Sequence, residues 1–342
     1  MDERIAAEVT SVTIGRGVLE EIADGPETLI VVLAQPGAAR VTARVVSDLE
    51  ARTIPVVTRM LPDAEEAKSF KVVEETTAWM GEIGVKRDGI VVAIGGGALT
   101  DIAGFIASVY MRGIEARYVP TTLLGAVDAA IGGKTALNVG GKNLVGTFAH
   151  PDRVVIDVDL LHELPDELLA EGMAEALKAG LIGDPGLVDV IERSGLHADL
   201  EEVVKRAVAV KSAIVEADFR EAGPRAHLNF GHTVGHAVEA VAGWSHGRSV
   251  AVGMVAASVI SRMVCGFDGE ERIEAIIAAL GLPVACPGLN RADLHRLMRI
   301  DKKSDSEGLR MVLLEGLGRP RVSHIDPATL DAGLDAIGIG DE

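Results

Sequence analysis

The first half of the chain alternates short runs of β-branched residues with segments whose apolar residues recur at helical spacing. Strand-like runs at 28–34 and 89–94 are each followed by such a helical pattern. This β–α–β–α order predicts a parallel, doubly wound sheet with helices on both faces. The last strand-like run covers residues 153–159, and from about 161 to 285 the pattern is almost all helical.

This change of pattern predicts two domains. We expect an α/β N-terminal Rossmann-like parallel-sheet domain over residues 1–152 and an all-α C-terminal domain, mainly helical, over residues 153–342. The length of 342 residues fits two domains at about 150 residues each. Because no repeat or low-complexity linker separates the halves, we expect them to pack closely, with a ligand cleft between them.

The composition is acidic and poor in aromatic residues. The formal net charge is -18, and aromatics make up 3% of the chain. Binding to DNA, RNA or anionic lipid needs a basic face, and single-strand binding uses aromatic stacking, so neither nucleic acid nor membrane is an expected partner. The N-terminus lacks a signal-peptide pattern, no apolar run reaches about 18 residues, and the two cysteines cannot form a disulfide framework. We expect a cytoplasmic enzyme with a small anionic substrate.

A glycine-rich turn follows the strand-like run at 89–94. Gly95, Gly96 and Gly97 lead directly into a helical segment that contains Asp101. Glycines there let the backbone approach a phosphate, and the start of the helix offers free N–H groups. The pattern is nearly GxGxxG, with Thr100 at the third glycine position, so a nucleotide site and a tight βα turn both stay open.

Two Gly-Lys pairs lie in a glycine-rich, otherwise uncharged stretch. They end in Lys134 and Lys142, and Asn143 follows the second pair. Lysines in such loops favour anion binding over simple solvent exposure. Neither pair matches the P-loop pattern, because no glycine lies five residues before the first pair, and an ATPase is therefore not indicated.

Three histidines lie within fifteen residues in a chain that has nine. His232 and His236 share a helix face at i, i+4, and His246 follows. This spacing resembles a zincin helix without its glutamate and favours a metal site over three structural histidines. Glu175 is a candidate carboxylate ligand, although with Lys178 at i, i+3 it also fits a surface ion pair.

Two further groups of cations are candidates for ligand binding. Lys211 interrupts an apolar helical stripe, which fits either a lysine at the core rim or one aimed into a polar cleft. Arg225 precedes the histidine segment, and Lys302 and Lys303 form a pair that alone fits a solvated turn.

Six ordered segments together resemble one known family. They are GGGALTDIAGF, PTTLLGAVDAAIGGKT, GKNLVGTF, GMAEALK, LNFGHTVGHAVE and DKK, and the resemblance covers residues from about 60 to 315. The chain resembles the 3-dehydroquinate synthases, members of the sugar phosphate cyclase superfamily. The resemblance implies a Rossmann-like NAD-binding domain, a helical metal-binding domain carrying Zn²⁺ (or Co²⁺), and a homodimer.

The resemblance also implies a role for each matching residue. It makes Glu175, His232 and His246 the metal ligands, and it turns His236 toward the substrate phosphate. The residues that it places along NAD are Asp63, Glu65, Lys68, Gly95, Gly96, Gly97, Asp101, Thr121, Thr122, Asp128, Lys134, Lys142, Leu160, Leu161, His162 and Glu163. Those that it places around the substrate's phosphate, carboxylate and reacting hydroxyls are Asp128, Lys134, Lys142, Asn143, Lys178, Lys211, Arg225, Asn229, His236, Lys302 and Lys303. Arg112 resembles an arginine that is donated to the neighbouring subunit's site.

The implied reaction converts 3-deoxy-D-arabino-heptulosonate 7-phosphate to 3-dehydroquinate and phosphate, a step of the shikimate pathway toward aromatic amino acids. NAD takes a hydride and returns it, so it acts catalytically. Three alternatives stay open. A sister cyclase, of the 2-epi-5-epi-valiolone or 2-deoxy-scyllo-inosose synthase type, would use a substrate without a carboxylate, which Arg225 and Lys211 disfavour. A metal-dependent polyol dehydrogenase would not need so many cations. A non-catalytic nucleotide-binding protein would not need the metal ligands.

Overall fold

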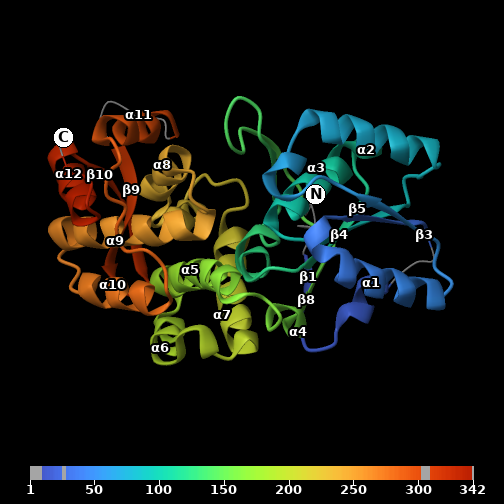
Figure 1. The fold of residues 1–342 in the computed structure, drawn as a ribbon, viewed down its shortest axis with the longest axis horizontal. Coiled ribbons are helices and arrows are strands. Elements are labelled where there is room, and N and C mark those ends of the chain that lie inside the picture. Colours follow the sequence, from blue (N-terminus) through green and yellow to red (C-terminus); the bar gives the residue numbers. More distant parts are fainter. Residues whose placement is uncertain (1–9, 25–27, 302–308, 341–342) are drawn as a thin grey trace, which may run out of the picture. The chain divides into compact units, whose positions relative to one another are not determined.

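The computed structural model describes residues 10–24, 28–301 and 309–340, without the side chains of residues 300 and 301. Two compact units are present, and the chain passes from the first to the second between Leu164 and Pro165 (Figure 1).

The first unit is built on a six-stranded parallel sheet with the strand order β1-β8-β5-β4-β2-β3. Every residue of β2 and β4 is buried, as expected where helices cover both faces of a sheet. This confirms the predicted doubly wound architecture. The strands are β1 (Ser11–Gly15), β2 (Ile30–Ala34), β3 (Val56–Met60), β4 (Ile90–Gly95), β5 (Glu115–Pro120) and β8 (Arg153–Asp157).

Helices flank this sheet, with α1 on one face and α2 and α3 on the other (Figure 1). The longer helices are α1 (Ala39–Ala51), α2 (Phe70–Glu82) and α3 (Gly97–Val109), and a single turn, α4 (Val158–Leu161), follows β8. A small antiparallel hairpin, β6 (Lys134–Leu137) with β7 (Val145–Phe148), carries the glycine-rich loop between its strands.

The division between the units comes later than the expected boundary at residue 152. β8 begins at Arg153 and pairs in parallel with both β1 and β5, so it lies inside the sheet. Its register with β1 runs over five residue pairs. A strand with partners on both sides cannot be separated from its sheet without breaking both ladders, and the segment up to Leu164 therefore belongs to the first unit.

The second unit is helical, as predicted, apart from one antiparallel hairpin. Residues Leu309–Gly316 form β9, and Arg319–Ile325 form β10. The apolar run at 311–314 is buried against α9, which explains why a hairpin occurs in this part of the chain. The helices are α5 (Asp166–Gly183), α6 (Pro185–Ser194), α7 (Leu200–Ala217), α8 (His232–Ala242), α9 (His246–Cys265), α10 (Glu270–Ala279), α11 (Arg291–Asp301) and α12 (Pro327–Ala336).

Helix α9 forms the centre of this unit. It packs against α5, α8, α12 and β9. Within the described residues it is the one helix whose length and apolar composition would suit a membrane span, but most of that stretch is buried inside the protein. These packing partners account for its apolar character, because they bury most of its residues.

Candidate metal centre and nucleotide site

Three side chains from three helices of the second unit converge on one point. Glu175 comes from α5, His232 begins α8 and His246 begins α9. One ligand atom from each lies within 4.8 Å of the others, a spacing that suits a single metal ion. The structure therefore brings together the three residues that the resemblance selected, including a carboxylate 57 positions before the first histidine.

Glycines allow these helices to approach closely. Gly231 has a φ of 77°, in the left-handed region that glycine adopts readily, and α8 starts at the next residue. A Cβ on Gly253 of α9 would lie only 2.0 Å from the Gly231 carbonyl oxygen. A Cβ on Gly247 would lie 2.6 Å from Glu171 Cα of α5. Contacts this short need hydrogen at both positions, and they bring the beginnings of α8 and α9 next to α5.

The two histidine rings are oriented through their Nδ1 atoms. His232 Nδ1 lies 3.1 Å from the Phe230 carbonyl oxygen, and His246 Nδ1 lies 3.2 Å from Glu239 Oε2. Since both of these partners are acceptors, Nδ1 of each ring carries a proton, and Nε2 is the atom that faces the cluster. Metal-ligating histidines are held by such outer contacts.

Both Nε2 atoms face the same carboxylate oxygen. Glu175 Oε1 lies 3.4 Å from His232 Nε2 and 3.2 Å from His246 Nε2. When both histidines are neutral, these three atoms are acceptors directed at one point, and they repel each other unless a cation or a proton lies between them. A divalent metal satisfies all three at once, so this donor set fits Zn²⁺ or Co²⁺.

The charges around this cluster are strongly coupled. Lys178 forms an ion pair with Glu175, and each of the two residues is 2% exposed, so this is a buried pair. Burial alone would raise the pKa of Glu175, but Lys178 and His232 hold it well below its ordinary value. Burial lowers the pKa of His232 to about 4. Burial would also lower the pKa of His246, but hydrogen bonds to Glu175 and Glu239 raise it to about 9.

His236 lies beside this cluster, one helical turn after His232. Its ring centroid is 5.2 Å from that of His232 and 5.9 Å from that of His246. With Glu239 and His246 it forms a second, less buried group of possible ligands. A metal ion could therefore be held by the zincin-like pair His232 and His236 or by the more buried group that contains Glu175. Metal retention by His232→Ala and His236→Ala variants distinguishes the two.

Several candidates for substrate binding lie in the second unit. Arg225 is 1% exposed, and its Nη1 donates to the Phe219 carbonyl oxygen at 2.5 Å. Lys211 is 8% exposed, which makes it a buried lysine. Asn229 donates from Nδ2 to Glu221 Oε1 at 2.9 Å. Lys302 and Lys303, also predicted to contact the substrate, lie outside the described residues.

In the first unit, a buried lysine joins three of the predicted nucleotide segments. Lys68 is 2% exposed, and its Nζ donates to Asp101 Oδ2 at 2.6 Å and to Asn143 Oδ1. Asn138 Nδ2 donates to Glu65 Oε2 at 2.7 Å. The PDAEEAK segment, the helix after the glycine turn and the glycine-rich lysine loop therefore meet around one charge.

The glycine turn has the geometry expected between a strand and a helix. β4 ends at Gly95, and α3 begins at Gly97. A Cβ on Gly97 would lie 2.8 Å from Ala129 Cβ, so the backbone of the turn is closely packed. Thr121 donates its backbone N–H to the Gly95 carbonyl oxygen, and the Thr122 side chain lies beside Gly96.

The other predicted nucleotide residues lie at scattered positions in the same unit. Asp128 is in a short π-helical turn, Gly125–Ala129, and Asp63 caps the 3₁₀ turn Ala64–Ala67. Lys134 begins β6, and Lys142 is exposed in the hairpin loop. Leu160 to Glu163 follow β8, and Glu163 pairs with Arg40.

Arg112 has a left-handed backbone, with a φ of 69°, and it directly follows Met111, whose φ is 48°. Consecutive non-glycine residues in this region are strained, and such strain is often found at functional positions. The side chain is exposed. Its expected role in a neighbouring subunit stays a prediction.

Sequence reasoning missed two residues that the structure assigns to these sites. Glu239 holds His246, and it was detectable as the acid three residues after His236 on the same helix face. Asn138 donates its Nδ2–H to Glu65 and accepts the Asn143 backbone N–H on Oδ1 at 3.0 Å. No pattern in the sequence distinguishes Asn138 from an ordinary loop residue.

Asp101 gives a testable pH dependence. Burial raises its pKa to about 6, against 3.8 for an exposed aspartate, even though Lys68 lowers it. The stability that a protonated Asp101 contributes is complete below pH 3.8 and is lost as the pH rises through about 6. We therefore expect Asp101→Asn to gain unfolding free energy relative to the wild type between pH 4 and 6, by at most about 3 kcal/mol, and the difference to stay constant at higher pH.

Urea unfolding of both proteins without nucleotide, at intervals from pH 4 to 7.5, measures this difference. The substitution also removes the contact with Lys68, and this loss changes the unfolding free energy by the same amount at every pH. It does not change how the difference between the two proteins depends on pH. The control is Asp88→Asn, which removes an exposed carboxylate outside this cluster. A pH-independent difference for Asp101→Asn would contradict the raised pKa.

Comparison with known proteins agrees with this geometry. The N-terminal profile of 3-dehydroquinate synthase matches residues 58–171, and the C-terminal profile matches residues 172–304. A 3-dehydroquinate synthase from Saccharopolyspora erythraea is 40% identical over 340 residues, which cover 95% of this chain and 92% of that protein.

Two solved structures of sugar phosphate cyclases have the same fold. The 2-epi-5-epi-valiolone synthase ValA from Streptomyces hygroscopicus subsp. jinggangensis 5008, with NAD⁺ and Zn²⁺ bound, superposes with a TM-score of 0.91 at 26% identity, over 98% of this chain and 99% of that one. A 2-deoxy-scyllo-inosose synthase complexed with carbaglucose-6-phosphate, NAD⁺ and Co²⁺ gives a TM-score of 0.85 at 26% identity, over 96% of each chain. With two matching profiles that together span more than half of its length, the chain belongs to the 3-dehydroquinate synthase family.

Proposed function

We propose that this protein is a 3-dehydroquinate synthase, an NAD- and metal-dependent lyase that converts 3-deoxy-D-arabino-heptulosonate 7-phosphate to 3-dehydroquinate and phosphate. The observation that carries the proposal is the convergence of Glu175, His232 and His246 on one point. It occurs in a chain that is 40% identical to a curated synthase over 95% of its length.

Glu175, His232 and His246 would hold Zn²⁺ or Co²⁺, and the bound metal supplies Lewis-acid polarisation of a substrate hydroxyl. The buried Lys178 ion pair keeps Glu175 ionised, and the Phe230 carbonyl keeps the lone pair of His232 directed at the metal position. These contacts prepare the ligands before the metal arrives, which is how outer contacts raise metal affinity.

The cluster around Lys68 in the first unit would bind NAD, which supplies reversible hydride transfer without net oxidation of the substrate. The role of the chain is to orient the dinucleotide. The Gly95–Gly97 turn lets the backbone approach the pyrophosphate at the start of α3. Lys68 ties Asp101 and Asn143 to this position.

Substrate recognition would depend on cations within an acidic protein. Arg225 and Lys211 are buried in the second unit and suit a carboxylate, while Asn229 and His236 adjoin the metal ligands and suit a phosphate. Lys134 and Lys142 carry further positive charge on the glycine-rich hairpin. Phosphate elimination from a held, charge-compensated substrate needs little more than positioning by the protein.

The activity assay also tests the rivals. Purified protein is incubated with NAD, Zn²⁺ and the heptulosonate phosphate, and released phosphate and 3-dehydroquinate are measured. We expect both products in equal amounts and no stoichiometric NADH. Conversion of sedoheptulose 7-phosphate instead would favour a sister cyclase such as the two structural neighbours, and accumulated NADH would favour a dehydrogenase.

Arg225→Ala tests carboxylate recognition. Removing a charged hydrogen-bond donor to a carboxylate costs about 1.5–3 kcal/mol, so we expect KM for the heptulosonate to rise at least tenfold, with a smaller change in kcat. Steady-state kinetics give both values, and thermal melting checks that the variant folds. Unchanged kinetics in a folded variant would exclude this role for Arg225.

We also propose a cytoplasmic homodimer in which Arg112 reaches the neighbouring subunit's site. The left-handed backbone at Met111 and Arg112 supports a functional position there. Mixing an Arg112→Ala chain with an inactive His232→Ala chain tests the idea. Subunit exchange should restore part of the activity only if Arg112 acts across the interface.

A further inference from the structure

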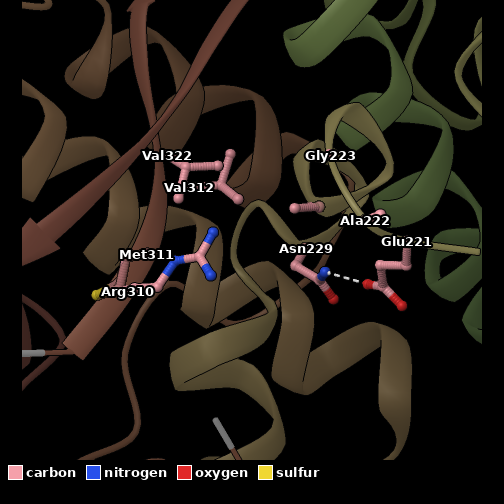
Figure 2. A pocket seen from close by; sticks show the side chains of 9 residues that line it. Glu221, Ala222, Gly223, Asn229, Arg310, Met311, Val312 and Val322 are labelled. Atoms are coloured by element: carbon pink, nitrogen blue, oxygen red, sulfur yellow. Dashed lines mark hydrogen bonds between the residues drawn. The ribbon is translucent and has the colours of Figure 1, made fainter. Parts of the chain in front are cut away.

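A pocket of about 220 Å³ opens in the second unit between the segment that precedes α8 and the β9–β10 hairpin (Figure 2). One wall comes from residues 221–229 and the other from residues 310–322. Its lining consists of Glu221, Ala222, Gly223, Ala226, Asn229, Arg310, Met311, Val312 and Val322. Asn229 stands three positions before the metal-ligand candidate His232, so the pocket adjoins the metal cluster along the chain.

The first wall is held in a fixed shape. The Asp218 carboxylate accepts backbone N–H groups from Ala222, Gly223 and Arg225 at 2.7–3.1 Å, and these bonds lower the pKa of Asp218. Glu221 has a left-handed φ of 59°, and its Oε1 accepts from Asn229 Nδ2. The turn therefore fixes the orientation of the Asn229 amide.

Arg310 stands on the opposite wall, near the start of β9. Its side chain extends across the pocket toward Asn229, and Asn229 lies between this guanidinium and the Glu221 carboxylate (Figure 2). The two other arginines of the hairpin use their donors internally, since Arg319 donates to the Glu315 carbonyl oxygen and Arg321 to the Glu315 carboxylate. Within the described part of the chain, no hydrogen bond or ion pair holds the Arg310 guanidinium, and Arg310 is exposed.

We propose that Arg310 is a further substrate-binding residue, which holds an oxyanion of the sugar phosphate in this pocket beside Asn229. The inference rests on the proposed function. A guanidinium offers planar donors that match two oxygens of a phosphate or a carboxylate together. Met311 and Val312 line the same pocket. The recognised chemistry is an oxyanion, and the phosphate and the carboxylate of the substrate are its two possible sources.

Kinetics test the role during turnover. Arg310→Gln should raise KM for the heptulosonate phosphate about tenfold or more, as expected for losing hydrogen bonds to a charged group, while kcat and metal content stay near wild type. Arg310→Lys should recover part of the loss. The control is Arg321→Gln on the same hairpin, which should leave KM unchanged. Wild-type KM for Arg310→Gln in a folded protein would overturn the proposal.

A binding measurement separates this inference from the proposed function. Inorganic phosphate, with acetate at equal ionic strength as the carboxylate probe, is added to the metal-loaded protein, and the rise in melting temperature is recorded. We expect at least one of the two anions to protect the wild type and Arg321→Gln, and to protect Arg310→Gln much less. The protecting anion identifies the oxyanion source. If the wild type turns over no heptulosonate but this difference persists, the proposed function fails and the oxyanion site stands. If phosphate and acetate raise the melting temperature of Arg310→Gln as much as that of Arg321→Gln and the wild type, the site is overturned.

Discussion

Replacing His232 with alanine is expected to remove the metal and, with it, the activity. The substitution takes one of three converging ligands, and leaves His246 Nε2 and Glu175 Oε1 facing each other at 3.2 Å without a third donor. Two ligands hold zinc far more weakly than three. We expect bound metal to fall from about one ion per chain to near zero after dialysis, and kcat to fall at least ~1,000-fold, which corresponds to about 4 kcal/mol of lost transition-state stabilisation.

Metal analysis by mass spectrometry and the phosphate-release assay measure these losses. The matched control is His197→Ala, since His197 is an exposed histidine of the same unit. His236→Ala adds a second comparison, because His236 stands outside the group that contains Glu175 and should therefore keep its metal. A His232→Ala protein that retains metal, together with a His236→Ala protein that loses it, would contradict this ligand set.

The ligand set also shows where sequence reasoning stops. The i, i+4 spacing of His232 and His236 is a local signal that indicates a metal near α8, whereas the more buried group of possible ligands joins His232 to His246 and Glu175. Glu175 lies on another helix, and only the tertiary packing of α5 against α9 brings it to the histidines. The local pattern around Glu175 fits a surface ion pair with Lys178 as well as a metal ligand, and the resemblance to a known family favoured the ligand.

The fold could also be predicted in part. Continuous apolar runs that alternate with helical segments predicted the parallel sheet, because a strand that is buried on both faces is apolar along its whole length. The same patterns gave no sign that β8 lies between β1 and β5, since strand order depends on crossovers rather than on local composition. The hairpin of β9 and β10 escaped prediction for a related reason, because a short apolar run fits a buried helix as well as a strand.

Gly253 lies where α8 packs closely against α9, and replacing it is expected to destabilise the protein strongly. A Cβ at this position would lie 2.0 Å from the Gly231 carbonyl oxygen and 2.7 Å from the Gly235 amide nitrogen. Both partners are backbone atoms, so neither can rotate away, and the two helices must separate. We expect Gly253→Ala to lower the unfolding free energy by about 3 kcal/mol and the melting temperature by roughly 10 °C.

The same separation should weaken the metal centre, which distinguishes this effect from general destabilisation. His232 directly follows Gly231, so moving that backbone carries the His232 ring away from Glu175 and His246. Zinc affinity should fall at least about tenfold, comparable to the loss of an outer contact. Gly81→Ala is the control, because Gly81 lies in α2 with no heavy atom within 4 Å of an added Cβ. It should leave metal binding unchanged and slightly raise stability, since alanine favours a helix over glycine. A Gly253→Ala protein with wild-type melting and wild-type zinc affinity would show that the spacing of α8 and α9 does not set the ligand geometry.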